Sequence, residues 1–111
     1  MNPTEQQEAE TLASYLKLKG YDHTHIPNET GGSPEAHRRA IRMMRAGVSK
    51  GFPDYLVFKD GKRFAIELKR VKGSRTSPEQ KEWLKTLAAY GFEAAVCHGA
   101  KEAIDFLEGT A

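Results

Sequence analysis

The sequence predicts an α/β fold in which helices cover both faces of a mixed β-sheet. Helix-like and strand-like segments follow one another along the 111 residues in the order α-β-α-β-β-α-β-α. The two central strand-like segments, residues 55–58 and 64–68, are apolar at consecutive positions, so both of their faces need cover. Helices packed on the two sides of the sheet would supply it.

Capping residues set the expected limits of the three longer helices. Ser and Thr side chains accept hydrogen bonds from first-turn N–H groups, Pro fits the first helical position, and Gly ends a helix. These residues are Thr4 and Gly20 for the first helix, Ser33, Pro34 and Gly47 for the second, and Thr76 or Ser77 with Pro78, and Gly91, for the third. A last helix is expected over residues 101–107, and outer strands over residues 21–26 and 92–97.

The second helix, expected to reach residue 46, alternates apolar and basic positions. Its apolar residues recur at helical spacing, which predicts a buried face. That face would hold Ala36, Ala40, Ile41 and Met44, with Arg38, Arg39, Arg42 and Arg45 largely outside.

The central strands are expected to form a β-hairpin. Asp60-Gly61 lies between apolar runs rich in β-branched and aromatic residues, and this pattern favours a two-residue type I′ turn. The turn fixes the register and places Asp54 directly across from Glu67. Lys69 follows two residues later on the same strand face.

Two opposed carboxylates in a sheet call for a compensating charge. Directly opposed Cβ atoms lie about 4.5–5.5 Å apart, and like charges at that distance destabilise the pair. A divalent cation between Asp54 and Glu67 would remove the repulsion, and carboxylate oxygens suit Mg²⁺, Mn²⁺ or Ca²⁺. The alternative is a half-exposed hairpin whose Glu67 and Lys69 are ordinary surface charges.

The motifs of this hairpin resemble those of a nuclease superfamily. Pro53-Asp54 followed by Glu67-Leu68-Lys69 is similar to the Pro-Asp…(Asp/Glu)-x-Lys, or PD-(D/E)xK, pattern. A longer set resembles the virus-type replication-repair nuclease (VRR-NUC) domain, in its stand-alone phage type. That set is Lys50-Gly51-Phe52-Pro53-Asp54, Ala65-Ile66-Glu67-Leu68-Lys69, Ser77-Pro78-Glu79-Gln80, Trp83-Leu84, Leu87 and Gly91. The resemblance covers residues 4–107 and is densest over 48–91.

The resemblance implies a restriction-endonuclease-like core and a Mg²⁺-dependent site, in which Mn²⁺ would substitute. It assigns metal binding to Asp54, Glu67 and the backbone carbonyl of Leu68, with Lys69 as a further catalytic residue. It places Gln80 beside the metal, although Gln80 would also serve as the partner of Ser77 in a capping box.

The resemblance also implies a metal-binding glutamate on the first helix. Glu5 falls nearest the centre of the apolar face that Ala9, Leu12 and Leu16 define, so it is the preferred candidate. Glu8 lies at the edge of that face and is the second candidate. Either carboxylate would also be favoured at a helix start by the macrodipole.

Composition limits the class of protein. The content of 29% charged and 39% hydrophobic residues is typical of a soluble globular protein, expected as one domain over residues 1–111. No apolar run has the ~20 residues of a membrane span, and the N-terminus lacks a signal pattern. Cys97 has no second cysteine to pair with. We therefore expect a cytoplasmic protein, in the host cytoplasm if phage-encoded, and no membrane partner.

The basic residues are clustered although the formal net charge is only +2. One run precedes the hairpin and another follows it, and clustered cations suit phosphates. The expected DNA contacts are Arg38, Arg42, Lys50, Arg70, Lys72 and Arg75. Two solvated faces are the alternative explanation.

Other motifs point less clearly to chemistry. His23 and His25 share a strand face, but no further ligands follow at structural-zinc spacing. Cys97 in an apolar strand is expected to be a buried small hydrophobe. Pro27-Asn28 with Gly31-Gly32 resembles a loop of phage family members, although Glu29 stands where Gly is usual.

The sequence as a whole therefore predicts a metal-dependent endodeoxyribonuclease that selects DNA by shape. It contains no base-reading module, so phosphate and shape recognition are favoured over sequence recognition. Stand-alone family members are similar to dimeric enzymes that cut branched DNA such as four-way (Holliday) junctions, which implies a homodimer here. The alternatives are a flap or nicking nuclease of the same fold and a catalytically silent DNA-binding module.

Overall fold

The computed structural model describes residues 2–27 and 33–110 and confirms the predicted order of elements. The phage-type loop residues Asn28, Glu29, Gly31 and Gly32 lie outside the described residues. The elements are α1 (Glu5–Lys19), β1 (Asp22–His25), α2 (Pro34–Arg45), β2 (Tyr55–Lys59), β3 (Lys62–Lys69), α3 (Pro78–Ala89), β4 (Glu93–His98) and α4 (Ala100–Glu108). No helix in the described part of the chain is both long and apolar enough to span a membrane.

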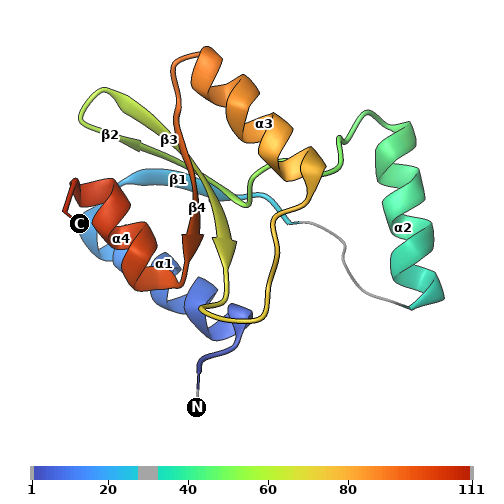
Figure 1. The fold of residues 1–111 in the computed structure, drawn as a ribbon, viewed down its shortest axis with the longest axis horizontal. Coiled ribbons are helices and arrows are strands. Elements are labelled where there is room, and N and C mark those ends of the chain that lie inside the picture. The colour runs from blue at the N-terminus through green and yellow to red at the C-terminus, as the bar shows by residue number, and fades with distance from the viewer. Residues whose placement is uncertain (1, 28–32, 111) are drawn as a thin grey trace.

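The four described strands form one mixed sheet in the order β1-β2-β3-β4 (Figure 1). β2 pairs antiparallel with β1 and β3, and β4 pairs parallel to β3. Lys59 pairs with Lys62 as predicted. Asp60 and Gly61 both have positive φ, 52° and 75°, which is the geometry of a type I′ turn.

The two faces of the sheet receive different helices. Alternate residues of β2 and β3 pack with Leu12 and Leu16 of α1 and with Ala103 and Leu107 of α4 in one hydrophobic core. The opposite face of β3 meets α3, whose Leu87 is buried. Residues of β3 from 64 to 68 are buried on both faces, which confirms the prediction that the hairpin is covered on two sides.

The predicted caps form as expected. The Thr4 side chain accepts a hydrogen bond from the N–H of Gln7, and Ser77 accepts one from the N–H of Gln80. Both are full capping boxes, because each glutamine side chain returns a bond to the backbone of its cap. The Ser33 side chain caps α2 by accepting a hydrogen bond from the N–H of Ala36, without a capping box, and Pro34 lies in the first turn.

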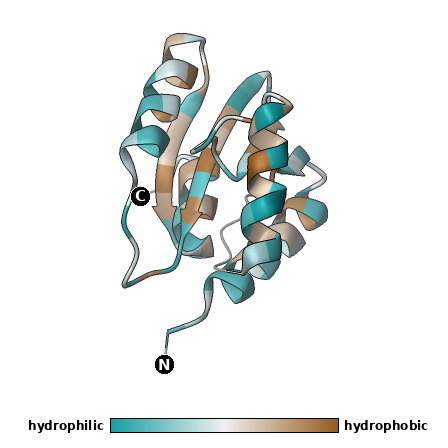
Figure 2. Ribbon diagram, turned by 90° about the vertical axis from the view of Figure 1, so that its right-hand side faces the viewer, coloured by the Kyte–Doolittle hydropathy of each residue, from teal (hydrophilic) through white to brown (hydrophobic). Residues whose placement is uncertain are grey.

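The predicted burial of the second helix is wrong. α2 lies to one side of the sheet in Figure 1 and does not cover it. Of its apolar residues only Ala36 is buried, while Met44 is 55% exposed and Ile41 is 38% exposed. The periodicity of α2 is real, and Figure 2 shows apolar and polar residues alternating along the helix facing the viewer. Its apolar face lacks a strand to pack on.

Candidate active site

The predicted carboxylates and lysine meet at the end of the hairpin, on the sheet face that α3 covers. The backbone N–H of Leu68 donates a 2.9 Å hydrogen bond to Oδ2 of Asp54. The Lys69 Nζ lies 3.5 Å from Oε2 of Glu67. Both side chains of that ion pair are largely buried, at 12% and 4% exposed. The hairpin register therefore brings Asp54, Glu67 and Lys69 into one cluster.

α3 adds Gln80 to this cluster. Its Nε2 donates a 3.0 Å hydrogen bond to Oε2 of Glu67, while its Oε1 accepts a 2.8 Å bond from the N–H of Ser77. Gln80 therefore forms the predicted capping box and also contacts Glu67, while its place beside a metal stays a prediction. Because the cap fixes the side chain, the orientation of Glu67 depends on where α3 begins.

The start of α3 is held close to the segment before β2 by Gly51. A Cβ at position 51 would lie 2.7–2.8 Å from the backbone and Cβ of Glu79 and the N of Gln80, and φ is +88°. Glycine therefore allows α3 to approach this segment closely. The rings of Phe52 and Trp83 pack edge to face with their centroids 5.0 Å apart. This contact also holds α3 against the segment before β2.

Glu67 is hard to ionise in the absence of a cation. Burial and the nearby Asp54 carboxylate raise its pKa from 4.5 to about 8, although Lys69 acts in the opposite direction. Its Oε1 is buried and has no hydrogen-bond partner among residues 2–27 and 33–110. An unsatisfied buried carboxylate oxygen is costly. A cation bound to this oxygen would remove the cost.

The chemistry of the donors fits a hard divalent cation of the Mg²⁺ type. Mg²⁺ is usually held by one or two carboxylates, with water and substrate phosphate completing the coordination. Asp54 and Glu67 supply the two carboxylates. The described residues contain no group of three or more His, Cys, Asp and Glu side chains that could hold a metal. A cation here would therefore depend on water, phosphate or backbone oxygen for its other ligands.

The two glutamates of the first helix differ in burial in the opposite sense to the one expected. Glu5 is exposed, and Glu8 is 8% exposed on the stripe that continues through Leu12 and Leu16. The Oε1 of Glu8 accepts a 3.0 Å hydrogen bond from the N–H of Ala100, at the start of α4. The expectation that Glu5 lies at the centre of the buried face is thus wrong. The metal role of either glutamate stays a prediction.

The reason for the reversal lies in α4. The sequence shows only the apolar side chains of α1, whereas the buried stripe also includes a carboxylate that caps the first N–H groups of another helix. Gly99 has no side chain to do this, and Oε2 of Glu8 lies 3.2 Å from where a Cβ on Gly99 would stand. Sequence spacing within α1 contains no signal for this contact.

The predicted DNA contacts are all exposed. Three of them, Arg38, Arg42 and Lys50, lie on or after α2, and Arg70, Lys72 and Arg75 lie in the segment between β3 and α3. Arg70 donates a 3.0 Å hydrogen bond to the carbonyl of Gly73, which holds part of that segment. Only Lys50 and Arg75 of the six line the groove described next.

A groove of about 350 Å³ lies between α2 and the carboxylate cluster. We call it the α2 groove. Lys69 and Gln80 line it and also contact Glu67, so the groove leads to the acidic pair. The full lining is Ala40, Met43, Met44, Val48, Ser49, Lys50, Gly51, Lys69, Arg75, Ser77 and Gln80.

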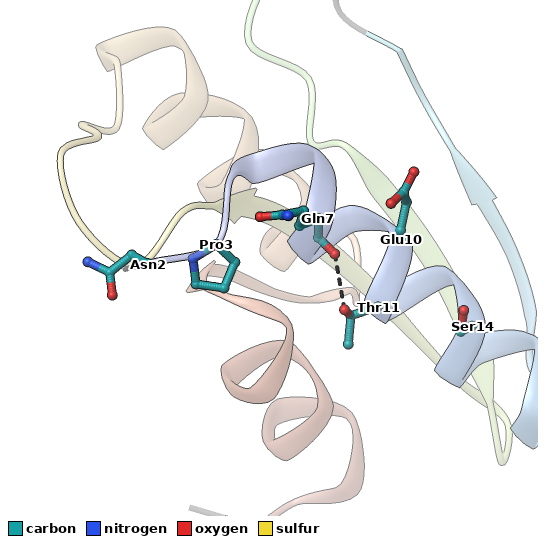
Figure 3. A pocket seen from close by; sticks show the side chains of 6 residues that line it. All are labelled: Asn2, Pro3, Gln7, Glu10, Thr11 and Ser14. Carbon is teal, nitrogen blue, oxygen red and sulfur yellow. Dashed lines mark hydrogen bonds between the residues drawn. The ribbon is translucent and has the colours of Figure 1, made fainter.

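A second hollow, on the outer side of α1, contains none of the predicted site residues. Figure 3 shows its lining, which is Asn2, Pro3, Gln7, Glu10, Thr11 and Ser14. The Thr11 hydroxyl is already bonded to the carbonyl of Gln7 at 3.0 Å. The hollow therefore gives no reason to move the candidate site from the hairpin.

The other reactive side chains of the sheet make contacts of their own. Cys97 is buried in the core, and burial raises the pKa of its thiol to about 12, which excludes a thiolate nucleophile at neutral pH. The His25 ring stacks on Tyr55 with centroids 4.6 Å apart, and His23 bonds through Nδ1 to the carbonyl of Tyr21. The expectation that Cys97 is a small buried hydrophobe is confirmed.

Comparison with known proteins agrees with the fold described above. A solved structure described as "VRR_NUC domain protein" superimposes with a TM-score of 0.77 at 24% sequence identity, and the match covers 98% of this chain and 88% of that chain. This likeness shows a shared fold. A search among curated proteins finds no match.

The fold and the hairpin motif define a nuclease domain of the PD-(D/E)xK type. The particular family follows from the sequence, because the model of the VRR-NUC domain matches residues 4–101. The chain therefore belongs to the VRR-NUC family.

Proposed function

We propose that this domain hydrolyses DNA phosphodiester bonds with Mg²⁺, or Mn²⁺ in its place, and that its preferred substrate is branched DNA. The observation that supports this most directly is the buried Oε1 of Glu67, which has no hydrogen-bond partner in the described part of the chain and faces the charge of Asp54. A carboxylate pair kept in this state is costly for the fold. Its retention is explained if a cation binds there during function.

The roles of the side chains follow from their positions. The cation, when bound, would make a water molecule more acidic and neutralise charge on the scissile phosphate. Asp54 is held in place by the N–H of Leu68, and Glu67 is held by Gln80. The Lys69 ammonium stands beside them with its charge partly screened from water, which suits it to stabilise a phosphate that gains negative charge.

Two further ligands remain part of this proposal. The backbone carbonyl of Leu68 follows Glu67 directly and would add an oxygen donor, as the family resemblance implies. Glu8 and Glu5 are the first-helix candidates, and of the two Glu8 is already engaged with α4. If Glu8 bound the cation through Oε2, its Oε1 could keep the bond from the N–H of Ala100.

The basic residues support a DNA substrate that is selected by shape. Arg38, Arg42, Lys50, Arg70, Lys72 and Arg75 are exposed and surround the hairpin in sequence. Contacts of this kind position a backbone without reading bases. Two copies related by a two-fold axis would present two active sites to the two strands of a four-way junction, so we propose a homodimer.

A cleavage panel tests the proposal. Labelled four-way junction, 5′ flap, single-stranded and linear duplex DNA are incubated with Mg²⁺ or Mn²⁺, and products are resolved on denaturing gels. We expect junction cleavage that EDTA abolishes. Glu67→Ala and Asp54→Ala should each lose cleavage by at least ~10²-fold while binding the junction as well as the unmodified protein.

The controls separate chemistry from folding and assembly. Glu10→Ala alters an exposed α1 carboxylate away from the cluster and should cleave normally. Light scattering with and without junction DNA reports the oligomeric state. Full cleavage by both site variants contradicts the nuclease mechanism. A strict monomer on DNA contradicts the dimer, and cleavage confined to flaps or nicked duplex contradicts the junction preference.

A further inference from the structure

The α2 groove has two chemically different walls. Ala40, Met43 and Met44 share one face of α2, and Val48 adds to them because its N–H bonds to the carbonyl of Met43 at 2.9 Å. We call these four residues the apolar wall. Met44 is 55% exposed and Val48 is 44% exposed. Large apolar side chains at a groove are typical of a binding surface.

The opposite wall is cationic. Lys50, Lys69 and Arg75 line it together with the polar side chains of Ser49, Ser77 and Gln80. No acidic residue occurs among the described residues that line the groove. Lys50 approaches Glu79 at 4.0 Å, but both side chains are well exposed and the pair is weak. The charge of this wall favours an anion.

An unpaired nucleotide fits both walls at once. Its phosphate would meet the cations, and its base would lie against the methionine and valine side chains, whose soft apolar surface suits an aromatic face. A base inside a double helix is covered by its neighbours and cannot make this contact. A groove of about 350 Å³ also suits one nucleotide better than a duplex.

The groove also lies at the right place relative to the acidic pair. Lys69 and Gln80, which line it, are 3.5 Å and 3.0 Å from the Glu67 carboxylate. A strand with one nucleotide in the groove would therefore pass the carboxylates with a neighbouring phosphate. Occupancy of the groove would position that phosphate.

We propose that the apolar wall receives a single unpaired nucleotide adjacent to the phosphate that is cut, so that the domain selects DNA with an unstacked nucleotide at the cleavage site. This inference rests on the proposed function. It assigns substrate selection to Met44 and Val48 and not to the catalytic cluster.

Binding measurements test the inference independently of catalysis. Fluorescence anisotropy is measured in metal-free buffer with two matched duplexes, one fully paired and one with a single unpaired 2-aminopurine bulge. We expect tighter binding of the bulged duplex by the unmodified chain. Met44→Ser/Val48→Ser should reduce that preference about tenfold, and should leave affinity for the paired duplex within about twofold.

The control variant is Ile41→Ser, which removes an exposed apolar residue from the same helix without touching the groove. It should keep the preference. Circular dichroism checks that α2 persists in each variant. The 2-aminopurine emission should change on binding to the unmodified chain and to Ile41→Ser, but not to the double variant.

Three results would overturn the inference. The first is an equal loss of affinity for paired and bulged DNA, which would make α2 a general phosphate surface. The second is an unchanged preference in the double variant. The third is conversion of a dimer to a monomer by Met44→Ser/Val48→Ser in light scattering, which would assign the apolar wall to a second copy. If groove binding behaves as expected and no substrate is cut, the groove still receives an unpaired nucleotide, but the proposed nuclease activity and the position of that nucleotide beside a cut phosphate both fail.

Discussion

At the scale of single residues, Glu67 shows how strongly this site departs from what folding alone would favour. It lies in the middle of a buried strand, between apolar neighbours on both sides in sequence, and its carboxylate faces that of Asp54. Gln80 and Lys69 share one of its oxygens, and the other has no hydrogen-bond partner in the described residues. A glutamate in this position reduces the stability of the folded chain.

Glu67→Gln should therefore stabilise the metal-free protein, and the gain should depend on pH. The pKa of Glu67 is about 8 in the folded chain and 4.5 in the unfolded chain. Below the lower value both states are protonated and the pKa shift contributes nothing. Between the two values the folded state binds more protons, so stability falls as pH rises, and it levels off above about pH 8.

The measurement is the thermal midpoint of both proteins from acidic to mildly alkaline pH in EDTA. We expect the midpoint of Glu67→Gln to exceed that of the unmodified chain by a few degrees above pH 8, and the two to converge below pH 4.5. Added Mg²⁺ should raise the thermal midpoint of the unmodified chain but not that of Glu67→Gln. A difference that does not change with pH would contradict the assigned cause.

At the scale of elements, the candidate active site depends on how closely α3 approaches the segment before β2. The capping box of Ser77 fixes the first turn of α3 and presents Gln80 to Glu67. Gly51 allows that turn to lie directly against the backbone that leads to Asp54. A helix boundary and one glycine thus position the Gln80 side chain against the carboxylate cluster.

Gly51→Ala should reduce both stability and cleavage. The new Cβ would lie under 3.0 Å from backbone atoms of α3, and the residue would keep a positive φ. We expect the free energy of unfolding to fall by about 3 kcal/mol, because overpacking adds to the conformational cost. Urea denaturation followed by circular dichroism measures the loss.

Gly47→Ala is the matched control. Gly47 also has a positive φ, +102°, but nothing lies within 4 Å of its Cβ position. The free energy of unfolding of Gly47→Ala should fall by about 1 kcal/mol, because only the positive φ opposes the new side chain. Equal losses in the two variants would show that the contact with α3 is not tight.

At the scale of the whole molecule, Glu108 joins three distant parts of the chain near its C-terminal end. Its carboxylate accepts hydrogen bonds from the hydroxyls of Tyr15 and Tyr21 and lies 3.2 Å from the Nζ of Lys59. Lys59 also bonds to the carbonyl of Leu107 at 2.8 Å. The end of α4 is thereby fastened to α1, to the segment before β1 and to β2.

Glu108→Gln should lower the thermal midpoint by a few degrees at neutral pH and by nothing near pH 2. The hydrogen bonds from Tyr15 and Tyr21, reinforced by Lys59, lower the pKa of Glu108 to about 2 in the folded chain, against 4.5 in the unfolded chain. The folded state therefore holds fewer protons between these values. The stabilisation is complete above the higher pKa and disappears as pH falls through the lower one.

Asp105→Asn provides the comparison on the same helix. Asp105 pairs with Lys101 at 2.8 Å, but that lysine side chain is 89% exposed, so the pair contributes little. The thermal midpoint of Asp105→Asn should stay near that of the unmodified chain at every pH tested. A loss equal to that of Glu108→Gln would contradict the view that the half-buried network of Glu108, and not charge on α4 in general, stabilises the fold.

Local chemistry made much of this structure predictable from sequence. The Asp60-Gly61 turn fixed the register that sets Asp54 opposite Glu67, and that register was confirmed residue by residue. The caps at Thr4, Ser33 and Ser77 were confirmed as well. Each of these features depends on contacts within a few positions along the chain, which a sequence displays directly.

The sequence alone thus determined the order of elements, the hairpin and the pairing of two carboxylates with a lysine, because turns, caps and strand alternation are short-range effects. Only the tertiary structure decided that Glu8 and not Glu5 is buried, because its partner is the N–H of Ala100, 92 positions away. It also decided that α2 leaves Met44 exposed beside the acidic pair. Helical periodicity predicts which residues share a face, whereas the packing of distant elements determines what that face meets.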